Sequence, residues 1–94
     1  MLFIQRLNMS KINLIDLKVK IDKNSFKTVQ NKCFKNSIFW DGSGAIKQPF
    51  NKNMFCLYFR GKSNTLQFGI HEYCFEIDKA KEVTVDDFLK RISK

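Results

Sequence analysis

The sequence predicts an α+β fold, with a mainly antiparallel sheet of four to five strands and a C-terminal helix packed on one face. Three observations support this class. Residues 54–77 have the pattern of a long β-hairpin, Ile12–Ile21 alternates between apolar and polar side chains, and residues 84–94 have the cap and apolar stripe of a helix. A chain of 94 residues is expected to form a single domain.

The register of the predicted hairpin follows from its apolar residues. With Gly61–Asn64 as the loop, Arg60 lies opposite Thr65, and one face carries three opposed apolar pairs. These are Phe55 with Ile70, Leu57 with Phe68, and Phe59 with Leu66. A slip of one residue would set apolar against polar side chains, so the pattern selects this register. The other face is expected to be open and to carry Met54, Cys56, Tyr58, Arg60, Thr65, Gln67, Gly69 and His71.

Beyond His71 the apolar side chains change face. The apolar residues of segment 73–77 would lie opposite to the hairpin core, and a straight strand would direct Glu72 and Glu76 inward. Burial of unpaired carboxylates is costly. We therefore expect a β-bulge or sharp twist near His71 and Glu72.

The first half of the chain contains weaker signals. Leu2–Leu7 is predicted to be a short strand and Ile12–Ile21 a longer one with one solvated face. Residues 1–8 are expected to be a dispensable extension, because Met9 is a plausible alternative start. Ser25–Lys35 fits a helix or a strand; we favour a short helix capped by Ser25. Its outer face would carry Lys27, Lys32 and Lys35.

A turn is predicted in the middle of the chain. Ser37–Trp40 reads as a strand, Asp41–Gly44 as a turn, and Ala45–Lys47 as a returning strand that ends at Pro49. The turn lacks the spacing of a phosphate-binding P-loop and does not lead into a helix, so we interpret it as a hairpin turn.

The C-terminal helix has the clearest signals. Thr84 is its expected N-cap and Asp87 occupies the third helical position, in the manner of a capping box. One apolar stripe is formed by Val85, Phe88, Leu89 and Ile92. This helix is expected to pack on the sheet.

The chain is basic, with a net charge of +8 and a pI of about 9.6. Residues 1–64 carry a net charge of +9, whereas residues 65–94 carry −1. A partner that recognises this charge would be anionic: a nucleic acid, an acidic protein or a membrane surface. Lysine outnumbers arginine 14 to 3, which is less suited to bidentate readout of phosphates or bases.

Cysteine usage and hydropathy predict a cytoplasmic protein. Cys33, Cys56 and Cys74 contain no close pair and are expected to be reduced, mostly buried thiols. A zinc site would need all three together with His71, and their spacing does not favour it. No cofactor or metal is expected. The apolar run Leu2–Ile4 is too short for a signal sequence, and no segment is long enough to span a membrane.

Two sets of residues are candidates for function. His71, Arg60, Tyr58 and Tyr73 could support metal-free RNA cleavage, through a general base, phosphate stabilisation and base stacking, although His71 has no paired acid. A binding face of aromatic and basic residues is the stronger candidate. It would comprise Lys18, Lys20, Trp40, Lys52, Tyr58, Arg60, Lys62 and Tyr73.

These observations favour a small non-enzymatic binding module. We expect a protein-binding inhibitor or immunity-type factor that acts on an acidic protein partner, because its charge would accelerate encounter. Two alternatives remain open. One is a domain that binds RNA or single-stranded DNA through lysine–phosphate contacts, and the other is a small ribonuclease toxin. The sequence does not indicate an oligomeric state.

Overall fold

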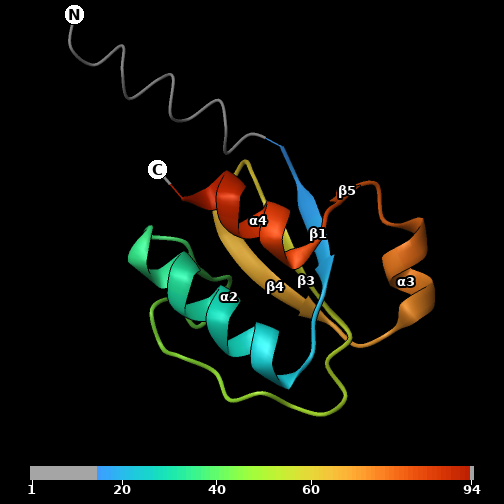
Figure 1. Cartoon of the computed structure of the whole chain (residues 1–94), viewed down its shortest axis with the longest axis horizontal. Coiled ribbons are helices and arrows are strands. Elements are labelled where there is room, and N and C mark those ends of the chain that lie inside the picture. Colours follow the sequence, from blue (N-terminus) through green and yellow to red (C-terminus); the bar gives the residue numbers. More distant parts are fainter. Residues whose placement is uncertain (1–14, 94) are drawn as a thin grey trace, which may run out of the picture.

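The computed structural model describes residues 15–93, which form a five-stranded sheet and three helices (Figure 1). The α+β class is therefore as predicted. The strand order is β2-β4-β3-β1-β5, so β3 lies in the middle of the sheet. The elements are β1 (Leu17–Lys20), α2 (Lys23–Lys35), β2 (Phe39–Trp40), β3 (Cys56–Arg60), β4 (Thr65–Gly69), α3 (Glu72–Ile77), β5 (Lys81–Glu82) and α4 (Val85–Ile92).

The hairpin β3–β4 has the predicted register. The observed pairs include Phe59 with Leu66, Leu57 with Phe68, Cys56 with Gly69 and Arg60 with Thr65. The side chains of Phe59, Leu66 and Leu57 are buried. The other apolar side chains predicted for this face of the second hairpin strand are not buried, however. Phe68 and Ile70 are about half exposed, at 47% and 48%.

Phe55 also departs from the expected face. It precedes the first residue of β3, and its ring packs edge-on against Phe75 with 5.5 Å between the ring centroids. Phe75 belongs to α3, on the other face of the sheet. Phe55 is thus not held to the strict alternation of the strand that follows it.

The sheet is mixed, which corrects the prediction of a mainly antiparallel one. Strand β3 is antiparallel to both β1 and β4, but β5 is parallel to β1 and β2 is parallel to β4. The reason lies in the connections. Helix α2 joins β1 to β2, and α3 joins β4 to β5. These helical crossovers make β2 parallel to β1 and β5 parallel to β4. Because β1 and β4 are both antiparallel to β3, they are parallel to each other, so β2 is also parallel to β4 and β5 to β1.

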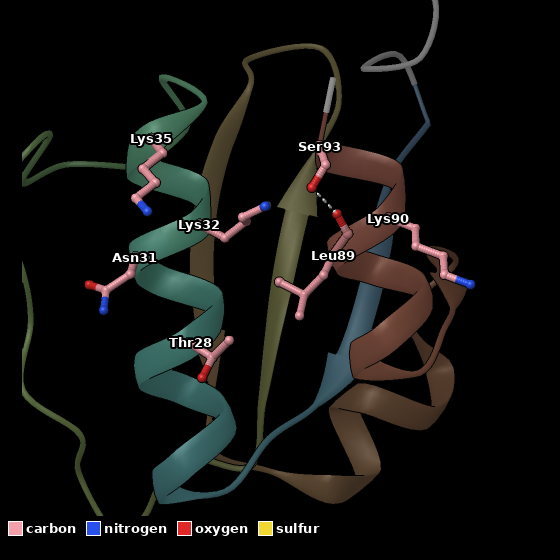
Figure 2. Close-up of a pocket in the computed structure, with 7 residues that line it drawn as sticks. All are labelled: Thr28, Asn31, Lys32, Lys35, Leu89, Lys90 and Ser93. Atoms are coloured by element: carbon pink, nitrogen blue, oxygen red, sulfur yellow. Dashed lines mark hydrogen bonds between the residues drawn. The ribbon is translucent and has the colours of Figure 1, made fainter.

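Helices α2 and α4 lie side by side on one face of the sheet (Figures 1 and 2). The prediction of a helix near Ser25–Lys35 is confirmed, but the helix begins earlier. Asp22 is the N-cap: its carboxylate accepts from the Ser25 amide at 2.8 Å, and the Ser25 hydroxyl accepts from the Asp22 amide at 2.7 Å. Ser25 is therefore the third helical residue of a capping box.

Helix α4 is as predicted. The Thr84 hydroxyl accepts from the Asp87 amide at 3.1 Å, and Phe88 and Ile92 are buried. These two residues complete a core between the helices and the sheet. Its other buried members are Leu17, Val19, Phe26, Val29, Cys33, Ile38, Trp40, Met54, Leu57, Phe59, Leu66 and Val83.

Helix α3 replaces the bulged strand predicted beyond His71, so that prediction is wrong. The helix turns Phe75 onto the sheet against Cys56 and Tyr58. Tyr73 is left 71% exposed. Glu72 and Glu76 are also exposed, so the helix keeps both carboxylates in solvent without a β-bulge. Apolar residues at every second position cannot distinguish a strand from a short helix that buries only one of them.

The turn Asp41–Gly44 is present, with Gly42 at φ 101° and Gly44 at φ 66°. Positive φ favours glycine, which explains both residues. The predicted strand Ala45–Lys47 is not formed: only an isolated bridge joins Trp40 to Gly44. The predictions for Leu2–Leu7, for an extension over residues 1–8 and for the first residues of Ile12–Ile21 lie outside the described part of the chain.

Of the three free cysteines, Cys33 and Cys56 are buried and Cys74 is exposed. Burial raises the pKa of the Cys33 thiol to about 12. In the described part of the chain, no helix combines the length and apolar character needed to cross a membrane.

We predict that Gly69→Ala destabilises the protein by about 1–3 kcal/mol, because overpacking forces neighbouring atoms to move. A Cβ at this position would lie 2.9 Å from both Cys56 Sγ and Tyr58 Cε2. The free energy of unfolding in urea measures the effect. Adding Cys56→Ala to Gly69→Ala should recover part of the loss, and wild-type stability of the single variant would contradict the predicted clash.

Candidate functional site

The sheet face that was expected to be open is covered by α3. Tyr58 is 7% exposed and packs with Phe75, and burial raises its pKa. Lys18, an expected phosphate contact, is 6% exposed. Its Nζ donates to the Phe75 carbonyl and, at 2.9 Å, to the Asp78 carbonyl. Lys18 thus binds the C-terminal end of α3, where a cation satisfies free carbonyl groups.

Arg60 is held by carboxylates on the same side of the sheet. Its guanidinium donates to both oxygens of Asp78, at 2.9 and 3.2 Å, and lies 3.5 Å from Asp16. Asp78 raises the pKa of Arg60, and Arg60 in turn lowers the pKa of Asp78. The guanidinium also covers the Tyr58 ring, at 4.6 Å from its centroid. Two of the four ribonuclease candidates are therefore engaged in holding the fold.

The other two ribonuclease candidates are exposed. His71 is the N-cap of α3 and makes no capping hydrogen bond with its side chain, and Tyr73 lies on the outer side of the same helix. The proposed phosphate-stabilising group, Arg60, is occupied by Asp78. With Arg60 bound to Asp78, these four candidates do not combine a general base with a free cation.

Trp40 is also buried, at 4% exposure, and has a structural partner. Its Nε1 donates to Gln30 Oε1 at 2.6 Å. The same oxygen accepts from the Gln48 amide at 2.7 Å, and Gln30 Nε2 donates to the Gln48 carbonyl at 3.1 Å. The buried Gln30 side chain therefore ties the segment around Gln48 to α2, and the Trp40 ring is not available for stacking on a base.

The remaining predicted contacts are dispersed lysines. Lys52 and Lys62 are exposed in the loops that precede and close the β3–β4 hairpin. Lys20 is exposed at the end of β1, with Nζ 5.7 Å from the centroid of the Phe75 ring. Together with the buried Lys18, they do not form a continuous basic face with the aromatic residues.

The strongest basic feature is the outer side of α2. This helix of thirteen residues contains four lysines and no acidic residue. We call them the lysine ridge: Lys23, Lys27, Lys32 and Lys35. Lys32 and Lys35 lie in the last turn, where their charges interact favourably with the negative end of the helix dipole. Lys23 and Lys27 lie near the opposite end, and like charges four residues apart destabilise a helix. Helix stability therefore explains only half of the ridge.

A hollow lies on each side of the lysine ridge, and Asn31 lines both. The first, the α2–α4 groove, has a volume of about 580 Å³. In Figure 2, Lys32 extends from α2 towards α4, and Leu89 extends from α4 towards α2. The complete lining comprises Thr28, Asn31, Lys32, Lys35, Leu89, Lys90 and Ser93.

The second hollow, the Phe50 pocket, has a volume of about 340 Å³ and lies between α2 and segment 47–50. Its apolar lining is formed by Phe26, Pro49 and Phe50. The rings of the two phenylalanines pack edge-to-face with centroids 5.6 Å apart. The lining is completed by Lys23, Lys27, Gln30, Asn31, Lys47 and Gln48.

Sequence reasoning identified part of this surface. It placed Lys27, Lys32 and Lys35 on an outer helix face but did not select them as binding residues. The signal was the run of lysines without an acidic neighbour. The Phe50 pocket had no local signal, because it depends on the contact of Gln30 with the Gln48 backbone, eighteen residues away.

Comparison with family models, with curated proteins and with solved structures found no match to this chain. Residues 15–93 contain no group of three or more histidine, cysteine, aspartate or glutamate side chains placed to hold a metal ion. The candidate site therefore rests on the geometry and charge of the lysine ridge and its two hollows.

We predict that Asp78→Asn lowers the free energy of unfolding at pH 7 by about 1–2 kcal/mol, because it removes a charged partner of Arg60. The folded-state pKa of Asp78 is lowered, so its stabilisation is complete above about pH 4 and is lost as the pH falls through the folded-state pKa. The difference between wild type and variant should therefore shrink in acid.

Urea unfolding between pH 7 and pH 3 measures this effect. Glu76→Gln is the matched control, because Glu76 is exposed in α3, two residues before Asp78. Wild-type and Asp78→Asn curves that stay parallel through acid would contradict the role assigned to the ion pair.

Proposed function

We propose that this protein is a small non-enzymatic binding module, of the inhibitor or immunity type, that presents the lysine ridge to an acidic protein partner. The observation that carries the proposal is the position of the ridge. Helix α2 carries four lysines and no acidic residue after its N-cap, and two of these lysines, Lys23 and Lys27, line an apolar pocket. Protein interfaces combine an apolar centre with a polar rim in this way.

Charge supports an anionic partner. None of the ridge lysines forms an ion pair with a carboxylate of residues 15–93, where the ion pairs involve Arg60 and Arg91. Asp22, the N-cap before Lys23, is the carboxylate nearest to them in the sequence, and it opposes only part of their positive potential. With a net charge of +8, the chain would attract an acidic surface and accelerate the encounter at low salt.

The arrangement of aromatic residues favours a protein over a nucleic acid. Single-stranded nucleic acids bind where exposed aromatic rings lie among cations. Here the exposed Tyr73 belongs to α3, whereas α2 covers the opposite face of the sheet. Trp40 and Tyr58 are buried. The ridge is accompanied instead by the phenylalanine-lined pocket, where Phe26 is buried and a single ring, that of Phe50, is partly exposed.

A nucleic acid remains the second candidate, because lysines along one helix can follow a phosphate backbone. The ridge extends over thirteen residues, or roughly 20 Å of helix. Such binding would fall steeply with salt, since each phosphate contact releases a counterion. The salt dependence of binding therefore separates the two candidates.

We expect selection from a displayed random-peptide library on the immobilised protein to enrich acidic sequences. The double variant Lys27→Gln/Lys32→Gln should raise the dissociation constants of the selected peptides by about five- to thirtyfold, because two ion pairs at the surface together contribute about 1–2 kcal/mol. Fluorescence anisotropy measures the dissociation constants.

The matched control is Lys79→Gln/Lys81→Gln, which removes the same charge from two exposed lysines, one in β5 and one just before it. An equal loss in both variants would indicate an effect of net charge and contradict the assignment to the ridge. Single-stranded RNA and DNA are titrated in parallel at several salt concentrations. Tighter binding of either one at physiological salt, dependent on the ridge, would overturn the proposal in favour of a nucleic-acid partner.

A further inference from the structure

We propose that the Phe50 pocket receives one hydrophobic side chain of the acidic partner, while carboxylates on either side of that residue contact the lysines at its rim. This inference rests on the proposed function and specifies the recognised segment: a short acidic peptide with a single apolar anchor.

The lining of the pocket gives the first argument. Phe26, Pro49 and Phe50 provide its apolar surface, and Phe26 itself is buried in the core at 2% exposure. Phe50 is partly exposed, so its ring is within reach of a ligand. A volume of about 340 Å³ lies at the lower end of the range for small-molecule sites and suits one side chain with its neighbouring backbone.

Charge at the rim gives the second argument. Lys23, Lys27 and Lys47 all line the pocket and are exposed. None of them is paired with a carboxylate of residues 15–93. An apolar residue that enters between them would bring its own neighbours close to three cations. Acidic neighbours complement that charge, and basic neighbours would be repelled.

The third argument is that the pocket wall is fixed before a ligand arrives. The Gln30 amide makes two hydrogen bonds to the Gln48 backbone, and Gln48 Nε2 donates to Ser43 Oγ at 2.9 Å. Proline at position 49 further restricts the chain. A preformed wall reduces the entropy that is lost on binding. Gln30 is therefore a positioning residue for the pocket.

The α2–α4 groove is less suited to an anchor. Its lining contains one large apolar side chain, Leu89, and no aromatic residue. In Figure 2, Lys90 extends away from α2. We therefore assign the groove to electrostatic contact and the Phe50 pocket to the anchor.

The test uses two labelled peptides of the same acidic sequence, one with a central phenylalanine and one with serine in its place. We expect the wild-type protein to bind the phenylalanine peptide about tenfold more tightly, because its side chain leaves water. Phe50→Ala should remove this preference and leave the weaker binding of the serine peptide. Tyr73→Ala, which removes an exposed aromatic ring from α3, is the matched control and should keep the preference.

A second variant guards against a loss of fold in Phe50→Ala. Asn31→Phe adds bulk at the edge of the pocket without removing a buried side chain, and it should also abolish the preference. Thermal unfolding confirms that each variant is folded. Lys27→Gln should weaken the binding of both peptides, because the contact between Lys27 and a peptide carboxylate does not depend on the phenylalanine.

The outcomes separate this inference from the proposed function. Equal affinity for the two peptides, with both weakened by Lys27→Gln, would overturn the anchor and retain an acidic partner. Binding of neither peptide by the folded protein would overturn both. A single-stranded oligonucleotide whose affinity depends on Phe50 would identify the pocket as a base-binding site and would also overturn the inference.

Discussion

The central strand β3 is buried on both faces, and the rest of the structure follows from this constraint. Leu57 and Phe59 face the layer of α2 and α4, whereas Cys56 and Tyr58 face α3. A strand with no solvated side needs cover from two directions. Helix α3 supplies the second cover but is only six residues long. It is held by Lys18 at its last carbonyls and by the ion pair of Arg60 with Asp78.

This cover determines which surface remains for a partner. The side chains that would have formed an aromatic and basic sheet face are used to attach α3. The helix with the most lysines in the described chain, α2, lies on the other side of the sheet. The proposed binding surface therefore follows from how helices cover the two faces of β3: α3 covers one face, and α2, which carries the lysine ridge, covers the other together with α4.

Local patterns predicted the parts of the fold that local interactions decide. The hairpin register followed from its opposed apolar pairs, and α4 followed from Thr84 and its stripe. Helix α3 could not be predicted in this way, because residues 73–77 alternate as a strand would. The buried state of Lys18 depends on carbonyl groups 57 and 60 residues away. For the candidate site, the composition of α2 indicated the ridge, but the Phe50 pocket required the contact of Gln30 with Gln48.

The two outer strands of the described sheet have a consequence for self-association. Both β2 and β5 are only two residues long, and each runs parallel to its neighbour. Exposed strand edges are templates for pairing with another chain, and very short edges offer few backbone groups for it. A chain with ten phenylalanines would be at particular risk of forming aggregates. Short edges, with Lys81 in β5 and Lys79 two residues before it, therefore offer another chain few backbone groups for strand pairing.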